Sequence, residues 1–181
     1  KLYYSPGACS LAAHIILNEI NVDFDLERVD LKTHKTSKGA DYYEINPKGY
    51  VPALEINPGL ILTENVAILP FLAQHDPIQD LIPPSGMGRA KVLEWLGYLN
   101  SELHDAYAVF FTGKLTDDEK NRAYAEVDRL LKYIDNYLAE SECDYLVDDN
   151  FGPADAYLFV LTNWSNHIEH DLTPYPNIVA L

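Results

Sequence analysis

The first 75 residues alternate short apolar runs with segments of helical periodicity. Runs rich in β-branched and aromatic residues predict strands, and apolar residues that recur every three or four positions predict helices. Between the last two runs, Asn57-Pro58-Gly59 has the composition of a hairpin turn. The predicted order, βαβαββα, indicates a small sheet layered with helices. Its members are a strand at Leu2–Tyr4, a helix from Ser10 to about Ile20, a strand around Phe24–Leu31, a short helix near Ala40–Glu44, strands around Ala53–Ile56 and Leu60–Thr63, and a helix from Asn65 to about Gln74.

A proline-rich stretch at residues 76–84 interrupts this pattern and predicts a linker between two domains, 1–75 and 85–181. The second domain has only helical periodicity, first from about Gly88 to Phe111 and then from Asp117 to Leu138. The sequence therefore predicts an α/β domain followed by an all-α domain.

Two helix starts in the second domain have recognisable capping residues. Thr116 stands three residues before Glu119, which predicts a capping box. Gly152-Pro153 precedes a segment that is apolar almost all round, so we expect a buried helix there. A turn-like Thr173–Pro176 comes shortly before the last residue, Leu181. We expect a further helix to follow this turn, and the predicted second domain therefore lacks its last helix in this sequence.

Composition and charge exclude several classes of function. The 181 residues are 48% hydrophobic, enough for a substantial core, and carry a formal net charge of -15, most of it after residue 75. This acidity argues against a nucleic-acid partner. No apolar run is long enough to span a membrane and no signal-peptide pattern is present. With only Cys9 and Cys143, a disulfide framework is not expected, so we predict a cytoplasmic protein.

The candidate chemistry centres on Cys9, which stands where the first strand meets the first helix. Free backbone N–H groups and the positive end of the helix dipole at such a position can lower the pKa of a thiol. Cys143 has no motif around it, and we expect it to be structural. The six His and two Cys form no set with the spacing of metal ligands, so no metal is expected. The lysines Lys32, Lys35, Lys38 and Lys48 form an ordinary solvated face, with Lys35 the one worth testing.

Three motifs together resemble the cytosolic glutathione transferases, most closely the bacterial beta class. Tyr3–Leu11 is similar to the beta-class active-site segment, Asn46–Leu54 to the loop before a cis-proline, and Leu62–Ile68 to the site for the γ-glutamyl group. The resemblance covers essentially the whole chain. It implies a thioredoxin-like N-terminal domain, a helical C-terminal domain and a homodimer.

The resemblance also implies which residues bind glutathione and activate its thiol. Val51 before Pro52 pairs with the cysteinyl backbone as an added strand, and Glu64 accepts the ammonium while Asn65 donates to the α-carboxylate. His34 and Lys35 lie where the family has a basic pair near the glycine end. The residues implied in thiol activation are Cys9, Ser10, Tyr4 and His104, the last from the segment Asn100–His104. Four further implied contacts with glutathione are those of Cys9, Pro52, Ser101 and His104.

Two positions depart from the beta-class pattern. Asp105 stands where the pattern tends to carry Lys, which places an unfavourable charge near an anionic ligand. Gly152 replaces the usual Ser or Thr cap, for an expected cost of a few tenths of a kcal/mol.

The implied activity is conjugation of the glutathione thiolate to a hydrophobic electrophile, as in detoxification, with glutathione as co-substrate and no cofactor. One alternative is a thiol-disulfide or peroxide reductase with Cys9 as redox nucleophile, since Cys9 lacks a Cys-X-X-Cys partner but could use glutathione. The other is a non-enzymatic ligand-binding module on the same fold.

Overall fold

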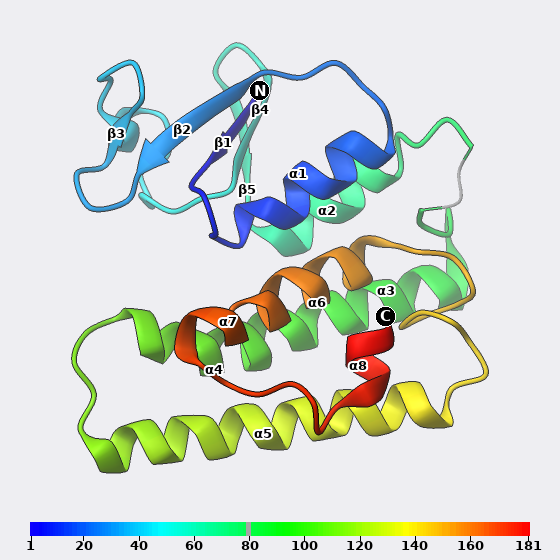
Figure 1. Ribbon diagram of the computed structural model, residues 1–181. Coiled ribbons are helices and arrows are strands. Elements are labelled where there is room, and N and C mark those ends of the chain that lie inside the picture. Colours follow the sequence, from blue (N-terminus) through cyan, green and yellow to red (C-terminus); the bar gives the residue numbers. More distant parts are fainter. Residues whose placement is uncertain (79–80) are drawn as a thin grey trace. The chain divides into compact units, whose positions relative to one another are not determined.

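The computed structural model describes residues 1–78 and 81–181 of the chain and divides it into two compact units, Lys1–Pro84 and Ser85–Leu181. The predicted linker at 76–84 includes Gln79 and Asp80, which lie outside the described residues. Each unit is built around its own set of elements (Figure 1).

The first unit is a five-stranded mixed sheet in the order β3-β2-β1-β4-β5. β1 pairs in parallel with β2 and antiparallel with β4, and the hairpin of β4 and β5 turns through Gly59 at a φ of 78°. The strands are β1 (Leu2–Tyr4), β2 (Leu26–Asp30), β3 (Lys35–Thr36), β4 (Ala53–Asn57) and β5 (Leu60–Thr63). The predicted order of strands along the chain is confirmed, apart from β3, which was not predicted because two residues show no periodicity.

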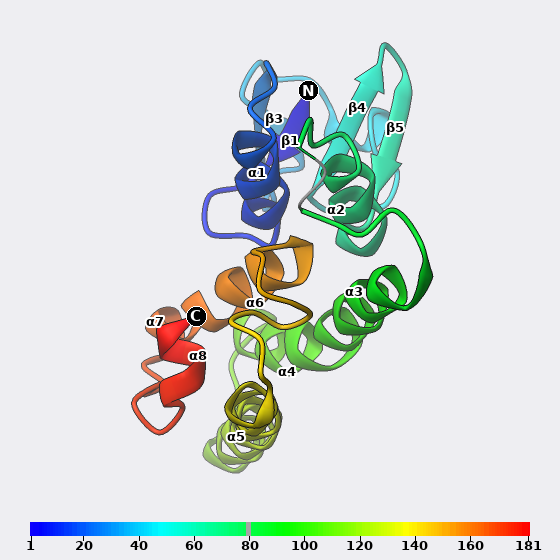
Figure 2. The same ribbon diagram turned by 90° about the vertical axis from the view of Figure 1, so that its right-hand side faces the viewer.

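Two helices and a short 3₁₀ turn complete this unit. α1 (Ser10–Glu19) and α2 (Asn65–Ala73) lie side by side in both views (Figures 1 and 2). The predicted short helix near Ala40–Glu44 is the 3₁₀ turn η1 (Tyr42–Glu44), whose start is capped by the Asp41 side chain. Tyr42 is fully buried in a cluster with Tyr3 and Val51, so this turn is anchored to the loop before Pro52.

The second unit begins with one continuous helical run, as predicted for Gly88–Phe111, although it starts two residues earlier. The run changes its hydrogen-bonding pattern along its length, with a π turn in the middle. It comprises α3 (Gly86–Tyr98), the π turn η2 (Leu99–Leu103), α4 (His104–Ala108) and the 3₁₀ turn η3 (Val109–Phe111). The π turn could not be read from the sequence, because the apolar positions continue through it.

The remaining helices include one, α6 (Pro153–Asn163), that is almost entirely buried. α5 (Asp117–Glu140) opens with the predicted capping box of Thr116, and α6 opens at Gly152. All of α6 is buried except Phe159 and the partly buried Asn163, as predicted. The other half of the capping box is present, because the Asp155 carboxylate accepts the Gly152 N–H at 2.8 Å. α7 (Ser165–Ile168) and α8 (Pro176–Ala180) follow.

The C-terminal segment is held to α5 by two carboxylates. The buried Asp135 accepts the backbone N–H groups of Asn177 at 2.8 Å and Ile178 at 3.0 Å, which caps the start of α8. About two turns earlier in α5, Asp128 pairs with the His170 ring at 2.9 Å and accepts a hydrogen bond from the Tyr175 hydroxyl. The segment therefore docks through polar contacts that span more than 40 residues of sequence.

Candidate active site

The turn before α1 places Cys9 at the helix start as its N-cap residue. The turn is closed by Ser10, whose side-chain oxygen lies 3.2 Å from the Ser5 amide nitrogen and 3.3 Å from the Ser5 carbonyl oxygen. Ser10 is fully buried. Its hydroxyl thus holds the loop that carries Cys9, and its predicted part in thiol activation stays a prediction.

A second loop brings Val51 to the same place. The Val51–Pro52 peptide bond is cis, and the loop is fixed because both the Tyr42 hydroxyl and the Asn46 amide donate to the Tyr50 carbonyl, at 2.9 and 2.8 Å. The Cys9 thiol donates to the Val51 carbonyl oxygen at 3.3 Å. The predicted loop before a cis-proline is confirmed in its geometry, and it lies against the predicted thiol.

The pKa of the Cys9 thiol is raised, and not lowered as the position at a helix start predicted. Burial raises the pKa of the Cys9 thiol to about 11, and the nearby Glu64 carboxylate adds to this, while the amides of Cys9 and Ser10 act in the opposite direction. The helix start does favour the thiolate, but desolvation is the larger effect. The sequence could not reveal it, because burial here depends on residues more than 40 positions away.

The start of α2 supplies the third part of the site. Glu64, its N-cap residue, has a φ of 72°, which is uncommon for a residue with a side chain, and such strained residues cluster at functional sites. Asn65 is buried, and its side-chain amide donates to the Cys9 carbonyl oxygen at 3.0 Å. The three motifs, distant in sequence, are thus joined by two hydrogen bonds through Cys9.

Asn65 makes a contact inside the protein that the sequence did not predict. Its side-chain amide donates one N–H to Cys9, and its Oδ1 has no hydrogen-bond partner among the described residues. The amide nitrogen carries a second N–H, so the predicted contact of Asn65 with the α-carboxylate stays a prediction.

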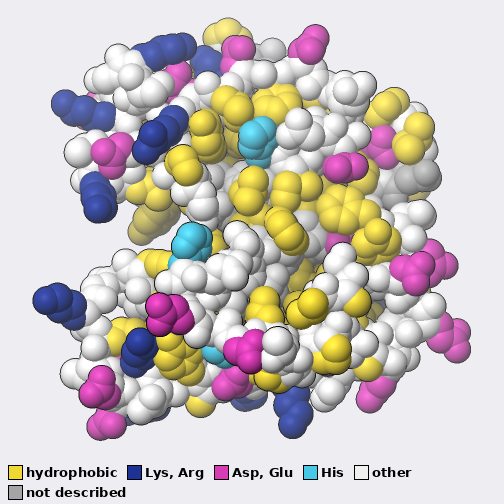
Figure 3. Space-filling model, viewed as in Figure 1, with side chains coloured by type: hydrophobic (Ala, Val, Ile, Leu, Met, Phe, Trp, Pro, Cys, Tyr) yellow, Lys and Arg dark blue, Asp and Glu magenta, His cyan; other side chains and the backbone are white. Residues whose placement is uncertain are grey.

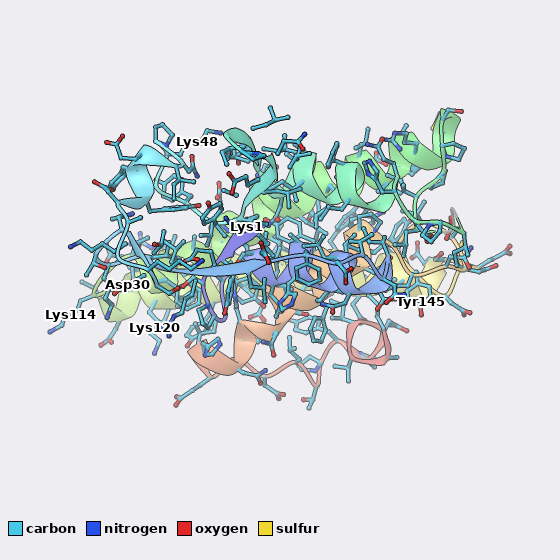
Figure 4. The ribbon with its side chains drawn as sticks, turned by 90° about the horizontal axis from the view of Figure 1, so that it is seen from above. Lys1, Asp30, Lys48, Lys114, Lys120 and Tyr145 are labelled. Carbon is cyan, nitrogen blue, oxygen red and sulfur yellow. The ribbon has the colours of Figure 1, made fainter. Side chains whose placement is uncertain are left out.

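Lys48 is a site residue that the sequence analysis assigned to an ordinary solvated face. Its ammonium lies 2.6 Å from the Glu64 carboxylate and 3.0 Å from the Thr63 hydroxyl, beside the first turn of α2 (Figure 4). Both charged side chains are half exposed. The signal available in the sequence was the position of Lys48 inside the motif Asn46–Leu54, close before the cis-proline.

The predicted basic pair lies at the end of the sheet where β3 is found, and lysine and arginine side chains gather there (Figure 3). Lys35 is exposed on β3. His34 adopts a φ of 51° and lies against Tyr43, with ring centroids 4.4 Å apart. Gly49 makes this packing possible, because a Cβ there would lie 2.7 Å from a Tyr43 ring carbon, and its φ of 74° also favours glycine.

Other predicted residues have separate surroundings. Tyr4 is partly buried, with its ring 6.3 Å from that of His14. Ser101 is an exposed residue of the π turn, and His104 begins α4. Burial lowers the pKa of His104, against the opposing effect of Asp105 at 3.6 Å. The roles of Tyr4, Ser101 and His104 stay predictions.

In residues 1–78 and 81–181, no three His, Cys, Asp or Glu side chains lie together as a metal site requires. Over the same ranges, no helix has the length and apolar character needed to cross a bilayer. What the site offers a ligand is therefore a backbone edge at Val51, a carboxylate at Glu64, an ammonium at Lys48 and the Cys9 thiol.

The sequence matches two family models in succession. Residues 1–74 match the glutathione S-transferase N-terminal domain, and residues 90–181 match the glutathione S-transferase C-terminal domain. The chain belongs to the glutathione S-transferase family.

Similar proteins show which class of glutathione S-transferase the chain resembles. The chain is 38% identical to glutathione S-transferase GstA of Escherichia coli O157:H7 over 99% of its own length and 89% of that protein's. It superimposes on a sphingomonad glutathione S-transferase complexed with glutathione (TM-score 0.93, 39% identity, 99% of this chain and 89% of that one). A bacterial beta-class enzyme from Sphingomonas chungbukensis gives a TM-score of 0.92 at 40% identity, with the same coverage. The resemblance to the bacterial beta class and the predicted fold class are confirmed.

Proposed function

We propose that this chain is an enzyme that conjugates glutathione to hydrophobic electrophiles. The observation that carries the proposal is the meeting of the three motifs at Cys9, which donates to the Val51 carbonyl and accepts from Asn65. The relative that was solved in complex with glutathione, at 39% identity, supports the same ligand here.

The geometry suggests how glutathione is held. Its cysteinyl backbone adds to the edge at Val51 by strand pairing, and its ammonium binds the Glu64 carboxylate. This places the glutathione sulfur near the start of α1, where backbone N–H groups favour a thiolate. In the reaction, the glutathione thiol loses its proton, its sulfur bonds to the electrophilic carbon, and the leaving group departs with the displaced electron pair.

A side-by-side assay separates this function from its alternatives. Purified protein is supplied with glutathione and, in turn, 1-chloro-2,4-dinitrobenzene, hydroxyethyl disulfide and a peroxide. We expect turnover of the chloronitrobenzene. Turnover of only the disulfide or peroxide would favour the reductase, and binding of glutathione with no turnover would favour a non-enzymatic module.

Glu64→Ala tests the binding mode. Loss of a charge-assisted hydrogen bond should weaken glutathione binding by ~1.5–3 kcal/mol in calorimetry. Unchanged affinity in a folded variant would remove Glu64 from the site.

The role of Cys9 is tested separately by Cys9→Ala. We expect this variant to lose mixed-disulfide formation with glutathione and disulfide reduction but to keep measurable conjugation, because the protein thiol is mostly protonated at neutral pH. Loss of conjugation in a variant that still binds glutathione would contradict this.

Three further expectations belong to the proposal. The enzyme forms a homodimer, which sedimentation at micromolar concentration tests; a monomer would refute it. It needs no cofactor beyond its co-substrate glutathione, so activity should survive dialysis against a chelator. It acts in the cytoplasm, which fractionation of the source cells would test.

A further inference from the structure

The amino-acid end of glutathione carries two opposite charges on one carbon, an ammonium and a carboxylate. A site that recognises this end needs an anion for the first and a cation for the second. Glu64 supplies the anion under the proposed function, on which this inference rests.

Glu64 is paired with the cation of Lys48, whose ammonium is 2.6 Å from the Glu64 carboxylate. The backbone at both ends of this pair is fixed. Lys48 donates its N–H to the Asn46 side chain at 3.2 Å, and the next residue, Gly49, has a φ of 74°. Glu64 is held at the start of α2, where its carbonyl accepts the N–H groups of Ala67 and Ile68.

The side chains of the pair are free to rearrange. Lys48 and Glu64 each expose 52% of their side chains, and ion pairs this exposed contribute little to stability. An incoming ammonium can therefore replace the Lys48 ammonium at Glu64 at little cost. The long Lys48 side chain would stay within reach of the ligand's other charge.

Asn65 alone does not balance that other charge. Its side-chain amide donates one N–H to Cys9 and keeps a second N–H, but the group is neutral. A carboxylate bound beside it therefore needs a countercharge, which the Lys48 ammonium can supply.

We propose that Lys48 binds the α-carboxylate of the γ-glutamyl group, so that Lys48 and Glu64 together select a free α-amino acid end. In the absence of ligand the two side chains neutralise each other. When glutathione binds, each exchanges its partner for one charge of the ligand.

The test combines protein variants with ligand analogues. Affinities are measured by calorimetry for glutathione, for γ-aminobutyryl-cysteinyl-glycine, which lacks the α-carboxylate, and for glutaryl-cysteinyl-glycine, which lacks the ammonium. Wild-type protein should bind each analogue with an affinity at least about tenfold lower than its affinity for glutathione.

Lys48→Met should weaken the binding of glutathione by that same factor and leave the affinity for the analogue without the α-carboxylate unchanged. Glu64→Gln should weaken the binding of glutathione and leave the affinity for the analogue without the ammonium unchanged. Lys48→Arg should restore most of the preference for the carboxylate. Lys32→Met removes another exposed lysine of this unit and should alter none of the affinities.

The outcomes separate the inference from the proposed function. If wild-type protein does not bind glutathione, the proposed function fails. If it binds but Lys48→Met keeps the full preference for the carboxylate, the inference is wrong and the function stands. Tighter glutathione binding by Lys48→Met would also overturn the inference, since Lys48 would then only compete for Glu64.

Discussion

Raising the pH from about 6.5 to about 9.5 should change how fast Cys9 is alkylated, because only the thiolate reacts. Burial places the pKa of this thiol at about 11. At pH 7, ~0.01% of Cys9 is then thiolate, against ~3% for an ordinary cysteine of pKa ~8.5. A thiolate of higher pKa is intrinsically about tenfold more reactive, so the net expectation is a rate ~30-fold below that of the unfolded chain.

The assay follows iodoacetamide labelling by mass spectrometry in the Cys143→Ser variant, where Cys9 is the single thiol. Native protein is compared with the same protein in denaturant at each pH. The logarithm of the native rate should rise by about one per pH unit with no plateau up to about pH 9.5, whereas the denatured rate levels off near pH ~8.5.

Steric protection is distinguishable from a raised pKa. Restricted access slows labelling by the same factor at every pH and leaves the inflection where it is. A native rate that levels off below pH ~9 would therefore refute the reasoning, as would native labelling as fast as denatured labelling at pH ~7.

Other predictions concern stability and turnover. Gly49→Ala should destabilise the protein by ~1–3 kcal/mol, because a Cβ would clash with Tyr43 in a left-handed conformation, and thermal denaturation measures this. Thr116→Ala removes the cap of α5 and should cost ~1 kcal/mol in urea unfolding. Burial raises the pKa of Asp155 to about 6, so the stability contributed by its protonated form is lost as the pH rises from ~4 to ~6. Over that range the free energy of unfolding of Asp155→Asn should rise relative to that of wild type by up to ~3 kcal/mol. His104→Gln should lower kcat for conjugation, and a kcat equal to that of wild type would exclude a role of His104 in thiol activation.

The elements that carry the site could be predicted because each has a local signature. The Asn57-Pro58-Gly59 turn fixes the hairpin, Thr116 and Glu119 fix the start of α5, and the sequence before Pro52 has the pattern of a loop leading into a cis-proline. Such signatures act over a few residues and do not depend on the rest of the chain.

What could not be predicted depends on distant contacts. The pKa of Cys9 follows from burial beneath the loop of Val51, and the partner of Lys48 lies 16 residues away at Glu64. The engagement of the Asn65 amide by Cys9 spans 56 residues. Residue type and spacing show that such groups are present, but not which of them meet before a ligand arrives.

The attachment of the C-terminal segment to α5 has a consequence for the order of folding. Asp135 and Asp128 are joined to residues 42 to 47 positions further along, whereas α5 is stabilised locally by its own capping box. The entropy of closing so long a loop must be lost before these contacts form, whereas α5 needs only local contacts, so we expect residues 170–178 to attach late to α5. The same segment should open first under native conditions, and its amide protons should exchange with solvent before those of α5 and α6.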